Sequence, residues 1–573
     1  MCGIFCSLSC NDHVVPDSNT EQVLRNRGPD SFGSHKTTID VNSDSKEPTG
    51  TLHATFLSTV LSLRGALIVD QPLLDAASNS VLCWNGEAWS IRDEPVAGND
   101  SQEIFSCFLH ASRTSSEEHR ETSLDRVISV VEAIRGPFAF TFYDAQHQYL
   151  YYGRDCLGRR SLLQKSTFPD SLILSSVCDN ASGDQWVEVE ADGIYVIDLT
   201  ASLLKPSLEL MHIPQRRKDC KENASRSLML PFPAMNRGLQ DTSQQPSPED
   251  VELLHSKLCQ SLQSRVQHVR ESMDVVASDH QEARAKVAIL FSGGLDCTVL
   301  ARITHELLPL GEDIDLLNVA FENPRVHKDL ATNVTPYELC PDRITGASSY
   351  AELQRVCPGR RWRFVQIDVP YSETLAHRTR VLALMHPHNT EMDLSISYAL
   401  YFASRGTGLV TDRPDGPSQP YSTAAHVLLS GLGADELFGG YQRHATAFTR
   451  QGYPGLIDEL ELDFNRLGKR NLGRDDRVIS DSGKEVRFPY LDEEFISFAL
   501  KLPVWSKCDF GNPQLLDSQE PARFLEPGKR ILRLLAWKLR MTGAAAEKKR
   551  AIQFGSRTAK METGKTKGTN VLS

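Results

Sequence analysis

The sequence predicts two domains of different class, the first rich in short strands and the second an α/β domain built on a doubly wound parallel sheet. At 573 residues the chain is too long for a single hydrophobic core. Up to about residue 200 it reads as short strands separated by turns, with β-branched and aromatic residues bounded by Gly, Asn and Asp. Beyond about residue 285, strand-like runs alternate with helical stretches, the pattern of a parallel sheet covered on both faces.

Residues 201–285 predict a polar linker followed by a connecting helix. The first part of this stretch is rich in Ser, Gln, Pro, Lys and Arg. Ser247 and Pro248 then indicate a helix start, with serine as the cap and proline at the first helical position. We therefore expect domains at 1–200 and 286–573, the second ending in a basic tail.

Composition and charge exclude several classes of protein. A net charge of -12 argues against nucleic acid as the main partner. No apolar run approaches the ~20 residues that span a bilayer, and the first residues lack the basic and apolar regions of a secretory signal. The 13 cysteines contain no Cys-x-x-Cys pair, which favours reduced thiols over a zinc ribbon. We expect a cytoplasmic protein with small-molecule substrates and no membrane partner; the oligomeric state stays open.

The chain begins MCGIFCSLSC, with a cysteine directly after the initiator methionine. One interpretation of Cys2 is a small, half-buried hydrophobic residue. The other is a nucleophile, because removal of Met1 would leave a thiol and a free α-amine on the same residue. That amine has an ordinary pKa of about 7.7–8.0 and can act as the general base for its own thiol. These two residues alone do not decide between the interpretations.

The stretch KVAILFSGGLDCTVLA predicts a phosphate-binding turn. A buried strand leads into Ser292, Gly293 and Gly294, and a helix begins near Asp296. Paired glycines permit a tight turn that brings backbone N–H groups to an anion at the start of the helix. The Asp296 carboxylate suits Mg²⁺. A Gly-Gly turn alone is a weak signal, because many α/β loops contain one.

A second strand-like run, HVLLS, ends in a glycine-rich turn that contains Asp435 and Glu436. The carboxyl ends of parallel strands meet at one crevice, where ligands bind. Either carboxylate alone can cap a helix. Two such loops at the same sheet edge favour a nucleotide site.

Together these motifs resemble the asparagine synthetase family. SGGLD is similar to the pyrophosphate loop of the ATP pyrophosphatase superfamily, and SGLGADELFGGY and EVRFPYLDEEF are similar to the family's synthetase domain. The resemblance implies an N-terminal class II glutamine amidotransferase, an Ntn-type α/β/β/α sandwich, followed by an ATP pyrophosphatase-like doubly wound sheet. It also implies ATP and Mg²⁺ as cofactors, and glutamine and aspartate as the other substrates.

For the synthetase domain the resemblance implies a set of phosphate and metal contacts. Lys529, in GKRILR, stands where the family places a lysine on the departing pyrophosphate. Asp296 and Asp435 are the implied Mg²⁺ ligands. The implied ATP- and pyrophosphate-binding residues are Phe291, Ser292, Gly293, Gly294, Asp296, Val319, Ser430, Gly431 and Lys529.

For the amidotransferase the resemblance implies a complete glutamine site. An Asn-Gly pair supplies side-chain and backbone donors for an oxyanion, and a guanidinium pairs with the glutamine carboxylate. Each residue also has a purely structural interpretation, as a surface arginine, a hairpin turn or a helix cap. The implied residues are catalytic Cys2, Asn85 and Gly86, glutamine-binding Arg64, Glu87 and Asp100, and the pocket-shaping turn Arg27-Gly28-Pro29-Asp30.

The synthetase half departs from the family pattern. Leu432 replaces a glutamate that faces the reacting centre, and leucine can neither accept a proton nor orient ammonia. Ser395 stands where the family has an arginine next to the acyl-adenylate. Cys297 replaces the serine after the loop aspartate, which removes a strong hydroxyl donor.

Three functions therefore stay open. The first is glutamine-dependent asparagine synthesis, in which ammonia released at Cys2 reaches a β-aspartyl-adenylate and AMP and pyrophosphate leave. The second is an amidotransferase with another carboxylate acceptor. The third is a scaffold that binds nucleotide or glutamine without turnover. The intact amidotransferase motifs favour an enzyme, because a scaffold does not need an N-terminal thiol.

Overall fold

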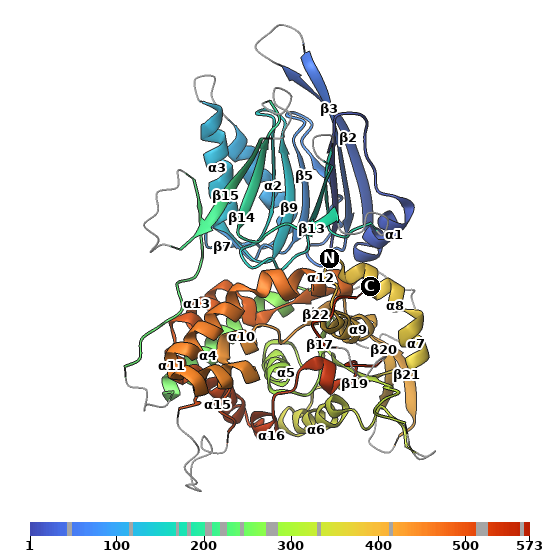
Figure 1. Ribbon diagram of the computed structural model, residues 1–573, viewed down its shortest axis with the longest axis vertical. Helices are drawn as coiled ribbons and strands as arrows, with labels where there is room; N and C mark the ends of the chain where they lie inside the picture. The colour runs from blue at the N-terminus through green and yellow to red at the C-terminus, as the bar shows by residue number, and fades with distance from the viewer. Residues whose placement is uncertain are drawn as a thin grey trace. The chain divides into compact units, whose positions relative to one another are not determined.

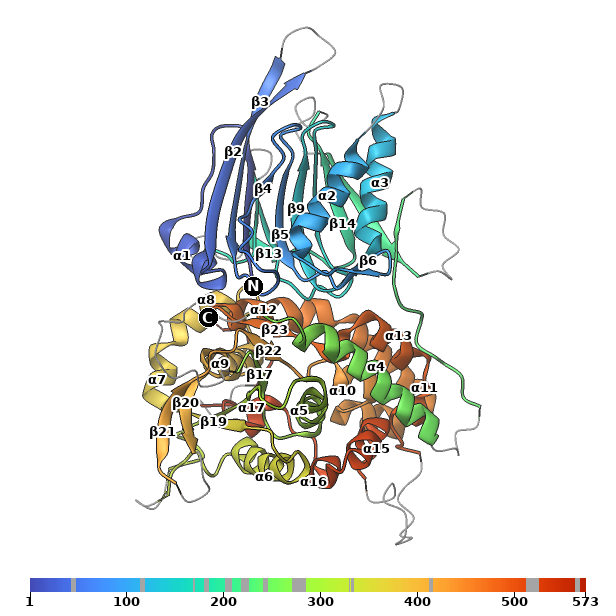
Figure 2. The same ribbon diagram turned by 180° about the vertical axis from the view of Figure 1, so that it is seen from behind.

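The computed structural model groups its residues into two compact units. Unit 1 contains Met1–Leu230, Ala383–His388 and Leu467–Gly483, and unit 2 contains Pro231–Leu382, Asn389–Arg466 and Lys484–Ser573. Figures 1 and 2 show the elements from opposite sides. The structure describes residues 1–42, 48–113, 119–167, 171–179, 185–200, 209–217, 226–240, 246–270, 285–328, 330, 334–411, 416–511, 525–561 and 567–572.

Unit 1 is built on two large sheets, antiparallel except for one short parallel pair, β15 with β16. The six-stranded sheet runs β13 (Trp186–Glu188), β11 (Leu163–Thr167), β12 (Ser171–Ser175), β1 (Gly3–Ser9), β3 (Pro48–Val60), β2 (Ser31–Asn42). The seven-stranded sheet runs β16 (Leu228–Met229), β15 (Glu209–Arg216), β14 (Gly193–Asp198), β10 (Tyr149–Arg154), β9 (Phe138–Asp144), β5 (Val81–Gly86), β4 (Leu73–Leu74). A small third sheet joins β7 (Glu94–Pro95), β6 (Ser90–Ile91) and β8 (Ile134–Arg135).

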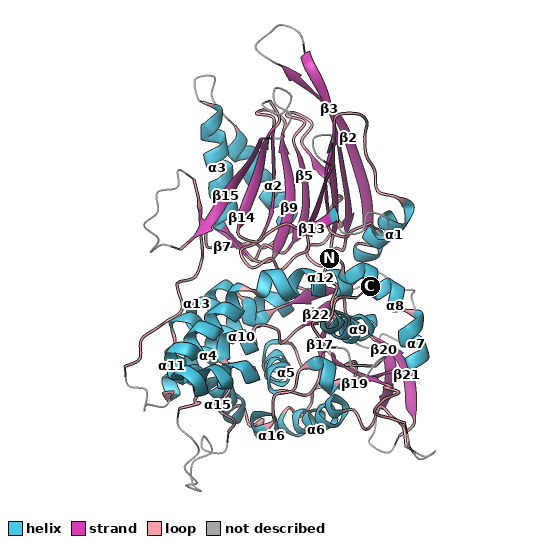
Figure 3. Ribbon diagram, viewed as in Figure 1, coloured by secondary structure: helices cyan, strands magenta, loops and turns pink. Residues whose placement is uncertain are grey.

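Apolar side chains fill the space between the two large sheets, including Ile4 and Cys6 of β1 and Cys83 of β5. Helices α2 (Asp100–Ser112) and α3 (Arg120–Ala133) pack on the other face of the seven-stranded sheet, in a second apolar cluster. Helix α1 (Ser18–Arg27) lies against β1 and β3. This layering, visible in Figure 3, confirms the predicted α/β/β/α sandwich.

Two parts of unit 1 differ from what the sequence predicts. Strands β15 and β16 lie within the stretch for which composition predicts a polar linker. β15 pairs antiparallel with β14, and its Met211 and Ile213 reach the helix-facing cluster. Two apolar residues at alternate positions are too weak a pattern to stand out among polar neighbours. Residues 383–388 and 467–483 also join this unit, from far along the chain, and 473–480 form helix α12 (Gly473–Ser480).

Unit 2 contains a seven-stranded sheet of order β21-β20-β19-β18-β17-β22-β23. β17, β18, β19, β22 and β23 are parallel, which confirms the predicted class, and β20 and β21 form an antiparallel hairpin at one edge. That hairpin is polar and mostly exposed, so it lacks the apolar pattern that identified the central strands. The strands are β17 (Val287–Leu290), β18 (Ile314–Phe321), β19 (Trp362–Val369), β20 (Thr407–Thr411), β21 (Ser418–Ser422), β22 (Val427–Leu429) and β23 (Glu485–Arg487).

Helices surround this sheet, and α5, α6 and α9 contact its strands directly. The first helix begins at Pro248 with Ser247 as its cap, as predicted, and Asp250 completes a capping box. The helices are α4 (Pro248–Val266), α5 (Leu295–Leu307), α6 (Pro341–Val356), α7 (Tyr371–Ala376), α8 (Arg378–Met385), α9 (Glu391–Arg405), α10 (Ala434–Phe438), α11 (Gln442–Asn465), α13 (Glu493–Lys501), α14 (Val504–Lys507), α15 (Arg530–Lys538), α16 (Thr542–Ala546) and α17 (Ile552–Gly555). Among the described helices, none combines the length and the apolar character that crossing a membrane requires.

Candidate functional site

Cys2 directly precedes β1, a strand that is paired on both sides and therefore rigid. β1 lies between β12 and β3. The Gly3 backbone N–H donates to Thr59 Oγ1 at 3.0 Å, and the Ile4 N–H donates to Ser176 Oγ at 3.0 Å. A Cβ at Gly3 would lie 2.6 Å from Thr59 Oγ1, so the glycine after Cys2 permits this close packing. The half-buried Cys2 is thus held at the start of a strand that is hydrogen-bonded on both sides.

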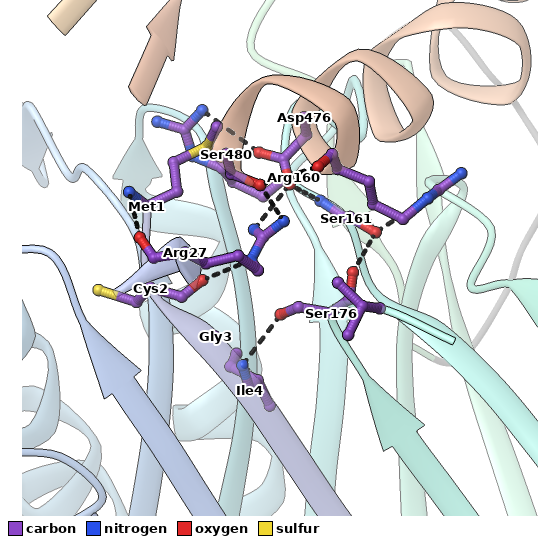
Figure 4. A network of polar contacts seen from close by, with 12 residues as sticks. Met1, Cys2, Gly3, Ile4, Arg27, Arg160, Ser161, Ser176, Asp476 and Ser480 are labelled. Atoms are coloured by element: carbon purple, nitrogen blue, oxygen red, sulfur yellow. Dashed lines mark hydrogen bonds and ion pairs between the residues drawn. The ribbon is translucent and has the colours of Figure 1, made fainter. Parts of the chain in front are cut away.

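Met1 covers the amine that Cys2 needs. The Met1 residue is 1% exposed, and its terminal ammonium group donates to the Arg27 backbone oxygen at 3.4 Å. Arg27 also contacts Cys2: its side-chain Nε donates to the Cys2 backbone oxygen at 3.2 Å (Figure 4). With Met1 attached, the Cys2 nitrogen is an amide without basicity. The chemistry expected of Cys2 therefore requires removal of Met1.

The side-chain amide of Asn85 is buried without a hydrogen-bond partner among the described residues. It lies near the end of β5, a strand that contacts β1, and it is fully buried. Its side-chain nitrogen and oxygen have no hydrogen-bond partner among the described residues. Leaving such a group unpaired costs about 1–3 kcal/mol, which a bound substrate can offset. The next residue must be Gly86, since a Cβ there would lie 2.7 Å from the Pro137 oxygen.

The three predicted glutamine-binding residues converge on the segment that follows β5. Asp100 Oδ2 accepts from the Ala88 backbone N–H and from Trp84 Nε1, both at 2.9 Å. Arg64 donates to the Ala88 oxygen at 3.0 Å, and its NH1 lies 3.4 Å from Glu87 Oε2. These contacts bring together an arginine and two carboxylates around one turn. They suit recognition of a substrate with one carboxylate and one amino group.

The predicted phosphate turn follows β17 and is fixed by its neighbours. Gly293 has φ +79°, and a Cβ there would lie 2.4 Å from the Gly346 nitrogen. Ser349 Oγ donates to the Gly293 oxygen at 2.7 Å, and Asn318 Nδ2 donates to the Phe291 oxygen at 2.9 Å. The turn opens on a cavity of about 160 Å³. Among the predicted nucleotide-binding residues, those that line this cavity are Phe291, Ser292, Gly294, Asp296, Val319, Ser430 and Gly431.

Lys529 lies between the two predicted metal ligands. Its Nζ is 2.6 Å from Asp296 Oδ2 and 2.6 Å from Asp435 Oδ1, and Lys549 Nζ is 2.5 Å from Asp435 Oδ2. Burial raises the pKa of Asp435, but the two lysine charges outweigh burial and hold that pKa well below its ordinary value. The adjacent Glu436 has a raised pKa because of burial and the Asp435 charge. Ionised aspartate at this position therefore persists throughout the physiological range.

The donor set around Asp296 fits a hard divalent cation. Asp296 Oδ1 and Glu436 Oε2 are buried without a hydrogen-bond partner among the described residues. Carboxylate oxygens are the ligands that Mg²⁺ prefers. Asp296 and Asp435 are thus suited to bind a Mg–phosphate group once the lysines turn to the phosphates.

Each of the departures from the family pattern has a local structural consequence. Ser395 Oγ donates to the Glu391 oxygen at 2.8 Å, so its hydroxyl is used inside its own helix. It lines a small cavity of about 20 Å³, which Lys560 also lines. Cys297 Sγ lies 3.3 Å from the Gly294 oxygen, and burial raises the pKa of this thiol. Leu432 is half-buried and places no polar side-chain group in its loop.

Several residues that line the cavity beside the phosphate turn are not among the predicted site residues. Lys549 and Arg550 line it from the segment EKKRAIQFGSR, which the sequence predicts only as part of a basic tail. The density of basic residues was the available signal. Asp342 also lines the cavity, and burial raises its pKa to about 7 in spite of the opposing Arg550 and Lys549 charges. A lone aspartate next to a proline carries no such signal.

Comparison with known proteins gives consistent results across the chain. The family model described as asparagine synthase matches residues 419–461 and 450–566. "Asparagine synthetase domain-containing protein 1" of Bos taurus is 35% identical, covering 100% of this chain and 97% of that protein. "Asparagine synthetase domain-containing protein YML096W" of Saccharomyces cerevisiae is 34% identical over 90% of this chain and 86% of its own. "Asparagine synthetase [glutamine-hydrolyzing]" of Gallus gallus is 21% identical over 88% and 77% respectively.

Proposed function

This chain belongs to the family of asparagine synthetase domain-containing proteins, and from that membership we propose that it is a glutamine-hydrolysing, ATP-dependent amide ligase that converts aspartate to asparagine. The observation that carries the proposal is the fully buried amide of Asn85, which has no hydrogen-bond partner among the described residues and lies on β5, a strand of the second large sheet that contacts β1. Such an amide is costly to keep and serves a developing oxyanion.

In the first half-reaction, removal of Met1 frees the Cys2 α-amine. The thiol passes its proton to this amine as sulfur bonds to the side-chain amide carbon of glutamine. The resulting oxyanion accepts hydrogen bonds from Asn85 Nδ2 and the Gly86 N–H. The proton then moves to the leaving nitrogen, so ammonia departs and a γ-glutamyl thioester remains. Water hydrolyses the thioester to glutamate and restores Cys2.

Glutamine is held by charge. We assign its α-carboxylate to Arg64 and its α-amino group to Asp100, with Glu87 lining the pocket. The contacts of Arg64 and Asp100 with the backbone of Ala88 support this assignment, because they fix both charged groups relative to β5. The two residues assigned to glutamine binding are thereby anchored to Ala88, two positions after the Asn85-Gly86 pair.

In the second half-reaction, the acceptor carboxylate attacks the α-phosphorus of ATP and pyrophosphate leaves. Ammonia then displaces AMP from the acyl-adenylate to form the amide. Mg²⁺ held by Asp296 and Asp435 would neutralise phosphate charge. Lys529 and Lys549, which contact these carboxylates, are placed to transfer their charge to the polyphosphate. The Ser292-Gly293-Gly294 turn supplies backbone N–H donors.

A different carboxylate acceptor is the second candidate, and the departures at Leu432 and Ser395 favour it. Loss of a positioned acid or base costs about 10²–10⁴-fold in rate, so slow asparagine formation follows from Leu432. If aspartate is the acceptor, Leu432→Glu should raise the ammonia-dependent rate about tenfold or more, and Leu432→Gln should not. Equal rates in both variants would favour another acceptor.

The deciding experiment supplies purified, Met1-processed protein with MgATP, aspartate and ammonia and follows AMP, pyrophosphate and asparagine together. Ammonia bypasses Cys2 and so isolates the half that departs from the family pattern. We expect asparagine and pyrophosphate in equal amounts. AMP and pyrophosphate without asparagine would mean that the β-aspartyl-adenylate forms but is not amidated, and would contradict asparagine as the product. The absence of all three products, with nucleotide still bound, would overturn the proposal in favour of another carboxylate acceptor or a binding protein.

A further inference from the structure

Resting on the proposed glutaminase activity, we propose that Asp476 is a positioning residue for Cys2 and acts through Arg27. Asp476 belongs to α12, far from the N-terminus in sequence, yet it lies in unit 1. Figure 4 shows the polar contacts that join this helix to the first residues of the chain. The assignment gives the segment 467–483 a chemical role in a site otherwise drawn from the N-terminal residues.

The Arg27 guanidinium links Asp476 to the nucleophile. Its Nε donates to the Cys2 backbone oxygen at 3.2 Å, its NH2 to Asp476 Oδ2 at 2.8 Å, and its NH1 to Ser480 Oγ at 2.6 Å. The side chains of Arg27 and Asp476 are both 0% exposed. Because the guanidinium is planar, the two contacts that α12 makes with NH1 and NH2 also fix the direction of the Nε–H bond. The direction of the Cys2 carbonyl is therefore set by α12.

Asp476 is itself fixed from the sheet side. The Ser161 backbone N–H donates to its Oδ2 at 3.2 Å, and Arg160 NH1 lies 3.8 Å from its Oδ1. Two arginines share this one buried carboxylate. Removing its charge leaves the Arg27 guanidinium fully buried without the carboxylate charge of Asp476, which favours movement of the guanidinium.

A second chain of contacts leads from α12 to the residue two places after Cys2. Arg477 NH1 donates to Ser161 Oγ at 2.9 Å, Ser161 Oγ donates to the Ser176 oxygen at 2.9 Å, and the Ile4 N–H donates to Ser176 Oγ at 3.0 Å. Both sides of the N-terminal segment are therefore tied to α12. Burying the Arg27–Asp476 ion pair alone would not need the second chain of contacts, which runs through Ser161 and Ser176.

The thiol and the α-amine of processed Cys2 both project from the same Cα. Anchoring the Cys2 carbonyl restricts rotation about the bond between this Cα and its carbonyl carbon, and thereby places the α-nitrogen and the Cβ that carries the sulfur. A displacement of about 1 Å at a reacting group can cost about 10²-fold in rate. Glutamine binding depends instead on Arg64 and Asp100. Loss of Asp476 should therefore lower kcat and leave KM nearly unchanged.

The test compares Asp476→Asn with Asp475→Asn in the full-length, Met1-processed protein. Asp475 is a matched control, because it is a buried aspartate of the same helix that pairs with Arg474 at 2.7 Å. Glutamate release gives kcat and KM, iodoacetamide alkylation of Cys2 across pH gives thiol reactivity without glutamine, and thermal unfolding monitors stability. Asp476→Glu tests rescue by a longer carboxylate.

We expect Asp476→Asn to lower kcat by about 10–100-fold at constant KM, and to slow Cys2 alkylation or shift its pH profile. Asp475→Asn should change neither, and Asp476→Glu should recover part of kcat. Equal losses in both asparagine variants, or an unchanged kcat and alkylation profile in Asp476→Asn, would overturn the proposal.

Should Asp476→Asn fail to fold, Ser480→Ala removes one anchor of Arg27 without leaving a charge unpaired. It should reduce kcat and alkylation in the same direction by a smaller factor, and unchanged values would contradict the inference. Alkylation also separates the two claims. A wild-type protein that does not hydrolyse glutamine contradicts the proposed function, whereas the dependence of Cys2 reactivity on Asp476 still decides the positioning claim.

Discussion

The polar groups around Cys2 and those around Asp296 differ in whether they are already paired with one another. In the amidotransferase half, Arg27 and Asp476 hold the backbone at Cys2, and the Asn85 amide stays without a partner. In the nucleotide half, the groups that would contact phosphate and metal already satisfy one another, with Lys529 between Asp296 and Asp435. The first site is organised in advance, which favours rate. Under the proposed function, the second would exchange its lysine–aspartate pairs for lysine–phosphate and aspartate–metal pairs.

The two halves also differ in their residue sets. All implied glutamine-site residues are present, and Arg64, Glu87 and Asp100 meet at one segment. In the nucleotide half the phosphate turn is intact, whereas Leu432 and Ser395 offer no free polar group where the family has a glutamate and an arginine. Of the two proposed half-reactions, ammonia production is therefore the one whose residue set agrees better with the family pattern.

The largest expected effect comes from Cys2. Cys2→Ala removes the nucleophile, so glutamine-dependent turnover should fall by about 10³-fold or more. The ammonia-dependent reaction should keep its rate, because it bypasses the thiol. Glutamate release and amide formation measure the two separately. If the variant still hydrolyses glutamine, the organised site described here is not the glutaminase.

Asn85→Ala tests whether the unpartnered amide serves chemistry. Loss of one oxyanion donor should lower the glutaminase kcat by about 10²–10³-fold. Since the substitution also removes a buried unsatisfied group, thermal unfolding should stay near that of the parent or rise. Steady-state kinetics and differential scanning fluorimetry check both. A large fall in stability would show that Asn85 is a structural residue and would weaken the contrast between the halves.

Lys549→Met examines the paired charges of the nucleotide half. It removes one of the two cations on Asp435 and should reduce ATP-dependent pyrophosphate release by about 10–100-fold, with no change in glutamate release. Lys548→Met, at the exposed neighbouring lysine, is the control. Similar effects of both substitutions would show that the loss comes from the lower positive charge of this segment and not from the contact with Asp435.

The smallest effect concerns Asp342, whose pKa burial raises to about 7 from an ordinary 3.8. The folded state then holds a proton that the unfolded state has lost, so this group lowers stability as pH rises from about 4 to 7. Asp342→Asn should raise the Tm by a few degrees at pH 8 and leave it unchanged at pH 4. Thermal unfolding at both values measures this. A lower Tm at pH 8 would indicate that the ionised carboxylate stabilises the fold.

How much the sequence predicts depends on how local each feature is. The strands on both sides of the phosphate turn follow from apolar runs, and the start of α4 follows from Ser247 and Pro248. Strand β15 cannot be recognised in the sequence, because only two of its apolar residues face the core. The pairing of Lys549 with Asp435 joins positions 114 apart, and the Arg27–Asp476 pair joins positions 449 apart. No local pattern encodes such contacts.

The site itself divides in the same way. The motifs at Cys2, Asn85 and Arg64 are short, and the sequence identifies them. That the Asn85 amide has no partner, that Met1 is buried, and that α12 joins unit 1 are consequences of packing. The unpartnered amide and the attachment of α12 order this half before a substrate binds, whereas the buried Met1 must first be removed. All three features follow only from the folded chain.

The central claim is that Cys2 is the nucleophile of a prepared glutamine site. The most direct measurement treats the full-length, Met1-processed protein with a diazoketone analogue of glutamine and maps the adduct by mass spectrometry. We predict one adduct, on Cys2, which excess glutamine prevents and Asp100→Asn weakens. No adduct on processed protein, or an adduct on the exposed Cys10 instead, would contradict the account.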